Sequence, residues 1–283
     1  MSSNSLVGAR VASLPRPTRA LARPSPVTVF GNYLHGAMTV AELEVRKLRH
    51  DPTELLTRAV QPALWLLIFG QAFSAIRAIP TGGISYLAFM TPGILAQSVM
   101  FISIFYGLTV IWDRDQGILQ KFLVMPVPRA SFVTGKALGA GVRALSQGVV
   151  VMCLALLLGV QLQWSVVGVV GALLTVVVGA GFFATVSMLI AIAVKTRERF
   201  MGLGQVITMP LFFASNAIYP LQIMPAWLQV VARVNQLSYL VDLLRGYLVA
   251  GSVPNAGLDW LVLVTALIVA QLIAGATFKT IVI

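Results

Sequence analysis

The chain has 283 residues, of which 58% are hydrophobic and only 10% are charged, and its formal net charge is +11. A soluble domain has about 25% charged residues, so this composition excludes an ordinary soluble globular protein and indicates an integral membrane protein. The basic residues stand between apolar runs, which points to the membrane rather than to nucleic acid as the reason for the positive charge.

The N-terminal part divides into a tail and an amphipathic segment. Residues 1–30 are rich in arginine, proline and serine and lack the apolar region of about 7–15 residues that a signal peptide needs, so we predict a disordered basic tail in the cytoplasm. Within 31–58, apolar and charged side chains fall on opposite sides of a helix at 38–50, namely Met38, Ala41, Val45 and Leu48 against Glu42, Arg46 and Arg49. This pattern suits a helix lying in the membrane surface, and it suits equally a solvated helix that packs on a partner.

Long apolar runs fill the rest of the chain. Asp51, Pro52 and Glu54 are helix-start signals ahead of the first run. The runs predict six transmembrane helices, at 59–76, 86–111, 138–160, 165–194, 200–220 and 258–278. We therefore expect 59–283 to form one all-α membrane domain. Small residues four apart at 135–139 and 180–184 favour close approach between helices.

The basic residues predict the orientation. With the N-terminus inside, the external segments hold only Arg77, Arg233 and Arg245, while the other 17 of the 20 lysines and arginines lie in internal segments. Cytoplasmic segments carry an excess of lysine and arginine, so both termini are expected in the cytoplasm.

The segment 112–136 is polar and twice interrupted by proline, although apolar runs flank it on both sides. On a helical wheel its apolar and polar side chains separate, with Ile118, Leu119, Phe122, Leu123 and Met125 on one arc, Gln116, Gly117, Gln120 and Lys121 on the other, and Val124 as the exception. This predicts an amphipathic helix at the inner face that ends at Pro126 and Pro128. An ordinary connector helix would show the same spacing, but a plain connection needs only a few residues, so the length favours a docking role.

The stretch "DRDQGILQKFLVMPVPRASFVTGK" at 113–136 resembles the cytoplasmic loop of ABC type-2 membrane permeases, particularly the daunorubicin-resistance-like and nodulation-type exporters. The matching positions are Asp115, Gly117, Leu119, Leu123, Pro126, Arg129, Gly135 and Lys136. The resemblance implies a coupling helix between the second and third spans, which an ATPase subunit would grip through an exposed side that includes Gln120 and Lys121.

Two further stretches resemble the same family. "YLAFMTPGILAQS" at 86–98 is similar to its second span, and "IMPAWLQVVARVNQLSYLVDLLRGYL" at 223–248 is similar to its external element. The second match is carried by Pro225, Trp227, Leu228, Asn235, Ser238, Tyr239, Asp242 and Arg245, whereas Gln236 stands where the family often has proline. The resemblance implies short external helices that re-enter the outer leaflet, although a surface-lying helix pair broken around 234–236 would have nearly the same sequence.

Neither nucleotide nor metal chemistry is indicated in this chain. The sequence has no G-x-x-x-x-G-K-S/T phosphate loop, and His35, His50 and Cys153 lack metal-ligand spacing, so we expect no metal site. All the acidic residues near the predicted spans flank them, which argues against an ion-coupled carrier. The driving force is then expected from outside the chain, and the resemblance implies two copies of a nucleotide-binding ATPase subunit that hold ATP and magnesium. The short loop "KTRER" at 195–199 is expected either to make a subsidiary contact to that subunit or to act only as a positive anchor.

Three neutral polar residues in or near the spans are candidates for the transport pathway, namely Gln97, Gln205 and Asn216. They either line the pathway or bond between helices, and we favour the second interpretation.

These patterns and the resemblance together indicate a non-enzymatic permease subunit of an ATP-driven exporter in a bacterial plasma membrane. It is expected to pair with a second permease chain, either a copy or a paralogue, and to move a drug, lipid or lipid-linked saccharide. The alternatives are an ion-coupled carrier and a membrane-embedded lipid-modifying enzyme. The latter would need paired acids, a histidine cluster or a nucleophile at membrane depth, and the sequence shows none.

Overall fold

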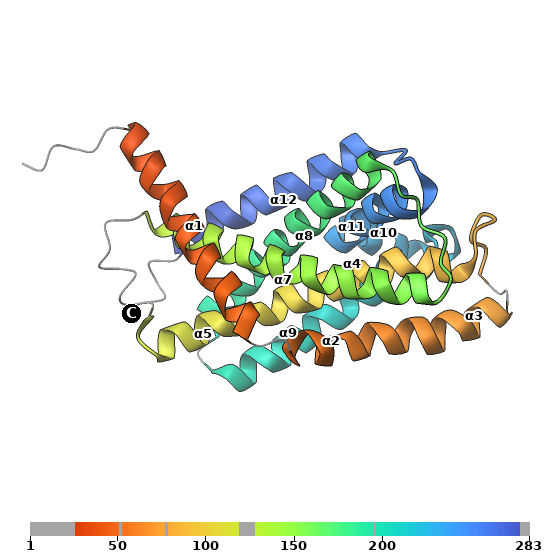
Figure 1. The fold of residues 1–283 in the computed structure, drawn as a ribbon, viewed down its shortest axis with the longest axis horizontal. Helices are drawn as coiled ribbons and strands as arrows, with labels where there is room; N and C mark the ends of the chain where they lie inside the picture. Colours follow the sequence, from red (N-terminus) through yellow and green to blue (C-terminus); the bar gives the residue numbers. More distant parts are fainter. Residues whose placement is uncertain (1–25, 51–52, 77–78, 119–127, 195, 278–283) are drawn as a thin grey trace, which may run out of the picture.

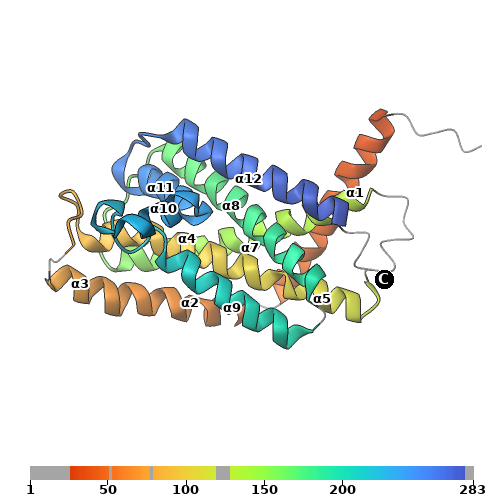
Figure 2. The same ribbon diagram turned by 180° about the vertical axis from the view of Figure 1, so that it is seen from behind.

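The computed structural model describes residues 26–50, 53–76, 79–118, 128–194 and 196–277. These residues form helices, turns and loops with no strand among them, as the sequence predicts. Figures 1 and 2 show an elongated bundle whose long helices run side by side, while α1 projects at one end. The helices are α1 (Pro26–His50), α2 (Thr53–Leu64), η1 (Trp65–Gly70), α3 (Gln71–Ile76), α4 (Tyr86–Tyr106), α5 (Leu108–Asp115), α7 (Arg129–Leu157), α8 (Val166–Ala193), α9 (Arg197–Phe213), η2 (Leu221–Ile223), α10 (Ala226–Val234), α11 (Gln236–Arg245), η3 (Gly246–Ala250) and α12 (Ala256–Thr277).

Four helices of the described chain are long and apolar enough to cross a membrane, and they occupy 86–115, 130–157, 166–193 and 256–277. They correspond to four of the six predicted spans. The first predicted span is a rod built from α2, the π-helix η1 and α3 (Figure 1), so no single helix in it reaches spanning length. The fifth, α9, has only 17 residues. Six spans therefore stay a prediction.

The boundaries of the long helices follow from local chemistry. The hydroxyl of Ser165 accepts a hydrogen bond of 2.9 Å from the backbone N–H of Gly168, which caps α8 one residue inside the predicted start. Helix α7 begins at Arg129, nine residues before the predicted span at 138, and it includes a buried lysine, Lys136. An apolar count misses this first part of α7 because the lysine is buried through ion pairs.

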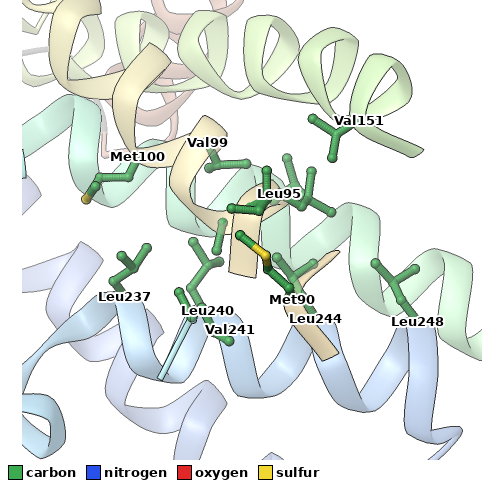
Figure 3. Packing of buried hydrophobic residues seen from close by; sticks show 14 of the residues in the cluster. Met90, Leu95, Val99, Met100, Val151, Leu237, Leu240, Val241, Leu244 and Leu248 are labelled. Atoms are coloured by element: carbon green, nitrogen blue, oxygen red, sulfur yellow. The ribbon is translucent and has the colours of Figure 1, made fainter. Parts of the chain in front are cut away.

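Helix α4 lies at the centre of the bundle and contacts α7, α8, α9 and α11. Figure 3 shows its apolar side chains facing those of α11 and η3. The labelled residues are Met90, Leu95, Val99 and Met100 of α4, Val151 of α7, Leu237, Leu240, Val241 and Leu244 of α11, and Leu248 of η3. Because α4 is enclosed by helices on several sides, it is apolar around its whole circumference.

The two short helices α10 and α11 meet at Asn235, where the sequence predicts a break. The Asn235 side-chain oxygen accepts a hydrogen bond of 3.0 Å from the backbone N–H of Leu237 and so caps α11. Its amide group donates to the carbonyl oxygen of Leu211 in α9 at 2.6 Å. Helix α11 packs against α4, α8 and α12, which places it inside the bundle rather than on its surface.

Two glycines of α7, Gly135 and Gly139, form the surface on which α1 packs. A Cβ atom at Gly135 would lie 2.6 Å from the carbonyl oxygen of Ala37, and one at Gly139 would lie 2.8 Å from the Glu44 Cβ atom. The spacing at 135–139 therefore allows close helix approach, as predicted, and the partner is the N-terminal helix α1.

Candidate functional site

The predicted coupling segment begins where α5 ends. The backbone N–H of Gln116 donates to the carbonyl oxygen of Trp112 at 2.9 Å, and Gly117 then adopts a φ of 70°. This left-handed conformation is strained for residues with a Cβ atom, so the glycine of the motif ends the helix. Residues 119–127 lie outside the described residues, and with them Leu119, Gln120, Lys121, Leu123 and Pro126. Arg129 is the first residue of α7.

Asp115 joins this segment to the start of α9. Its carboxylate lies 2.9 Å from the guanidinium of Arg197, which belongs to the "KTRER" stretch at the start of α9. The Arg197 guanidinium also lies 5.8 Å from the centre of the Trp112 ring. Both charged side chains are partly exposed, so the pair contributes at most about 1 kcal/mol of stability. The pair instead fixes the position of the end of α5 relative to the start of α9.

A buried ion cluster includes Asp113 of α5, three residues before this segment begins. The Lys136 ammonium of α7 is 2.8 Å from a carboxylate oxygen of Glu44 in α1 and 2.5 Å from one of Asp113 in α5. Lys136 as a whole is only 1% exposed, and both carboxylate side chains are buried. Its third contact is the Thr109 hydroxyl, at 3.3 Å. One cation therefore joins three helices that are distant in the sequence.

Arg143 and Tyr106 complete the cluster. The Arg143 guanidinium lies 3.6 Å from the second carboxylate oxygen of Glu44. The centre of the Tyr106 ring lies 5.4 Å from the Lys136 ammonium and 5.3 Å from the Arg143 guanidinium carbon. Two acids and two bases thus balance in charge. We call Glu44, Asp113, Lys136, Arg143 and Tyr106 the inner ion cluster.

A second network lies at the opposite end of the bundle. The Arg245 guanidinium donates to the carbonyl oxygens of Asn216 at 2.8 Å and of Phe89 at 3.3 Å, and its central carbon lies 3.9 Å from the centre of the Phe89 ring. The Asp242 carboxylate accepts from the Asn216 amide at 2.6 Å and lies 3.6 Å from Arg245. We call Asn216, Asp242 and Arg245 the outer network.

Both networks fall within a stretch that matches a known family. A profile of the ABC-2 type transporter family matches residues 36–249, about three quarters of the chain. The chain belongs to the ABC-2 type transporter family.

Named relatives of this ABC-2 chain are transport permeases. It is 32% identical to the putative transport permease ycf38 of Cyanophora paradoxa over 203 residues, which cover 70% of this chain and 69% of the relative. It is 27% identical to the daunorubicin resistance ABC transporter permease protein DrrB1 of Streptomyces coeruleorubidus over 224 residues, or 79% and 75% of the two chains. It is 26% identical to the inner membrane transport permease YadH of Escherichia coli K12 over 207 residues, or 71% and 77%.

Sequence reasoning missed the inner ion cluster of this ABC-2 chain. Glu44 shares a helix face with Ala37 and Val40, which lie seven and four residues earlier, and all three are buried against α7. The predicted apolar face of 38–50 instead includes Met38, which is 63% exposed. The signal available in the sequence was an acidic residue placed four and seven residues after two small or branched apolar residues. These three positions lie on one helix face, which is the face that contacts α7.

The remaining predicted site residues are distributed over α4, α9, α10 and α11. Pro225 precedes α10, and Trp227 on its first turn is 69% exposed. The Tyr239 hydroxyl donates to the carbonyl oxygen of Arg233 at 2.5 Å and holds α10 against α11. Gln97 is buried within α4, while Gln205 on α9 lines a cavity. Among the described residues, no group of three histidine, cysteine or acidic side chains could hold a metal ion.

Proposed function

We propose that this ABC-2 chain is the permease subunit of an exporter in a bacterial plasma membrane, and that a separate ATPase subunit supplies the driving force. Family membership and relatives named as transport permeases support this proposal. In the proposed orientation, the inner ion cluster faces the cytoplasm, both termini are cytoplasmic, and six segments cross the bilayer. The excess of basic residues in the corresponding loops supports this orientation.

The inner ion cluster is the observation that carries the coupling mechanism. Lys136 holds α1, α5 and α7 together, and its partner Asp113 lies three residues before the 116–125 segment in the sequence. Helix α5 continues from α4 after Gly107. Separating a buried ion pair leaves an uncompensated charge and costs about 3–5 kcal/mol, so these helices resist moving independently. A displacement of the 116–125 segment would therefore be transmitted to α1, α5 and α7 as one unit.

The ATPase subunits would dock on the two neighbouring loops. The Asp115–Arg197 contact holds the "KTRER" loop against the end of α5, so both loops can contribute to one docking surface. In this proposal Asp115, Gly117, Leu119, Gln120, Lys121, Leu123, Pro126 and Arg129 form the coupling element. Two ATPase copies would hold ATP and magnesium, because the present sequence lacks a phosphate loop.

A second permease chain, either a copy or a paralogue, would complete the pathway for a hydrophobic or amphipathic substrate. Helices α10 and α11 would cover its external end, and the burial of α11 among α4, α8 and α12 supports a position within the outer leaflet. Gln205 and Gln97 are the candidate lining residues. Asn216 is already bonded to Asp242, which favours a role in holding the helices together.

Two glycines provide a matched test of docking. Gly117 and Gly82 adopt φ values of 70° and 68°, and they flank the helical stretch 86–115 at its two ends. Aspartate replaces the glycine at each of the two positions, and each variant is co-expressed with the proposed ATPase partner. We expect Gly117→Asp to abolish co-purification and transport, whereas Gly82→Asp retains both. Equal behaviour of the two variants would contradict the docking assignment.

The purified chain alone is expected to show no ATP hydrolysis. Turnover is measured with the chain in detergent, with and without the ATPase subunit. Nucleotide turnover by the chain on its own would refute its assignment as a non-enzymatic subunit.

A further inference from the structure

A polar cavity lies beside the outer network. It has a volume of about 340 Å³, and its walls come from α4, α11 and α12 and from the segments 216–222 and 250–255. Binding pockets for small molecules have volumes of about 300–1,000 Å³. Leu221 and Val253 supply apolar surface next to the polar groups of the cavity. The cavity can therefore accommodate a small molecule that has both a polar and an apolar part.

The charged side chains that line this cavity sum to one negative charge, because they are Asp242, Asp259 and Arg245. The Arg245 guanidinium lies 3.6 Å from the Asp242 carboxylate and donates its hydrogen bonds to backbone carbonyl oxygens. Within the part of the chain that the structure describes, Asp259 has no basic partner, although it is only 4% exposed. Its place on the first turn of α12 favours a negative charge, since helix N-termini carry a partial positive charge. A buried carboxylate that lacks a cation favours a positively charged ligand.

An unused acceptor belongs to the same cavity. Asn216 is 3% exposed and lines the cavity, and its amide group donates to the Asp242 carboxylate at 2.6 Å. The side-chain oxygen of Asn216 has no hydrogen-bond partner among the described residues. A buried polar atom without a partner is costly unless a ligand or water satisfies it. Because an amide oxygen only accepts hydrogen bonds, the ligand group that satisfies it must be a donor.

The ligand group that fits this set of side chains has a positive charge and several donors. A primary ammonium group has one positive charge, three N–H donors and no acceptor. The cavity offers it two carboxylates and one amide oxygen. A quaternary ammonium group has the charge without the donors, and an alcohol has a donor without the charge. A metal ion fits less well, since the described residues contain no group of three histidine, cysteine or acidic side chains that could hold one.

We propose that this cavity binds the primary ammonium group of an amphiphilic amine at the external end of the bundle. The ammonium group donates to the carboxylates of Asp242 and Asp259 and to the side-chain oxygen of Asn216. Leu221 and Val253 contact the apolar part of the amine. The inference rests on the proposed function for the external position of the cavity and for the assignment of amphiphilic amines as the class of cargo.

Binding of small amines to the purified full chain tests the proposal. The chain in a nonionic detergent at neutral pH is titrated with hexylamine, 1-hexanol and hexyltrimethylammonium, and the affinities are measured by isothermal titration calorimetry. We expect hexylamine to bind at least about tenfold more tightly than either of the other two, since each hydrogen bond to a charged group has an effect of this order. Magnesium chloride at the same concentration should not displace hexylamine.

Two variants that each remove one negative charge localise the binding. Asp259→Asn keeps the size of the side chain and should weaken hexylamine binding about tenfold. Glu42→Gln changes an exposed side chain of α1 that does not line the cavity, so it should leave the affinity unchanged. Equal effects of the two variants would overturn the proposal.

The unaltered chain provides two further decisive outcomes, which do not depend on the folding of a variant. Equal affinity for hexylamine and hexyltrimethylammonium, or displacement of hexylamine by magnesium, would also overturn the proposal. The titrations use the chain without the ATPase subunit, whereas co-purification with that subunit tests the proposed function. The amine site can therefore fail while the proposed function stands, and the reverse outcome is equally distinguishable.

Discussion

The two charged networks of this ABC-2 chain are built in different ways. The inner ion cluster joins three helices through buried side chains, and Lys136 makes two close ion pairs. The outer network connects neighbouring segments mainly through backbone carbonyl oxygens, and its acid, Asp242, has a side chain that is 41% exposed. The inner cluster is therefore suited to making helices move together, whereas the outer network holds short helices beside a polar cavity.

Removing the central cation should have the largest effect on stability. Lys136→Met leaves Glu44 and Asp113 buried without their shared partner, so we expect a loss of about 3–5 kcal/mol. Equilibrium unfolding in mixed micelles measures it. Adding Glu44→Gln and Asp113→Asn to this variant should recover part of the loss. A change below about 1 kcal/mol in the single variant would show that the pairs do not hold the helices.

The corresponding change in the outer network should cost less. Arg245→Met removes hydrogen bonds to two backbone carbonyl oxygens and the contact with the Phe89 ring, for an expected loss of about 2–3 kcal/mol. The same unfolding assay applies. Because the Asp242 carboxylate is partly exposed and keeps its bond to Asn216, water compensates it in part. A loss larger than that of Lys136→Met would reverse the comparison between the two ends.

The close packing of α1 on α7 can be tested by adding one methyl group at Gly135. Gly135→Ala places a Cβ atom 2.6 Å from a backbone oxygen of α1, so we expect a loss of about 1–3 kcal/mol as the helices separate. Gly202→Ala on α9 is the matched control, since its Cβ atom would meet nothing within 4 Å, and it should be neutral or slightly stabilising. Similar stability of the two variants would indicate that α1 is not closely packed on α7.

The smallest effect on stability is expected at the exposed pair. Asp115→Asn removes the ion pair with Arg197 and should change the free energy of unfolding by less than about 1 kcal/mol. If the pair positions the two loops for docking, co-purification with the ATPase subunit should nevertheless weaken. Retained co-purification would remove Asp115 from the coupling element.

The apolar runs predicted the long helices because burial in lipid requires continuous apolar sequence, and α8 began within one residue of its predicted start. The apolar runs did not predict the start of α7, because Lys136 interrupts the apolar sequence there although its ion pairs allow it to be buried. Glu44 and Asp113 could not be placed together from sequence, because they are 69 residues apart and are joined only in the folded structure, through Lys136 of α7. The break between α10 and α11 at Asn235 could be predicted from sequence, because a capping residue bonds to backbone groups only a few residues away.

The most direct test of the account is whether α1 and α7 stay together when ATP is used. Spin labels at Met38→Cys and Leu138→Cys, both exposed, in a chain with Cys153→Ala, report the distance between the two helices in the complex with the ATPase. If the inner ion cluster holds these helices together, the distance distribution is the same without nucleotide and with trapped ATP. A shift of the α1–α7 distance between these states would contradict the claim that the inner ion cluster makes these helices move as one unit.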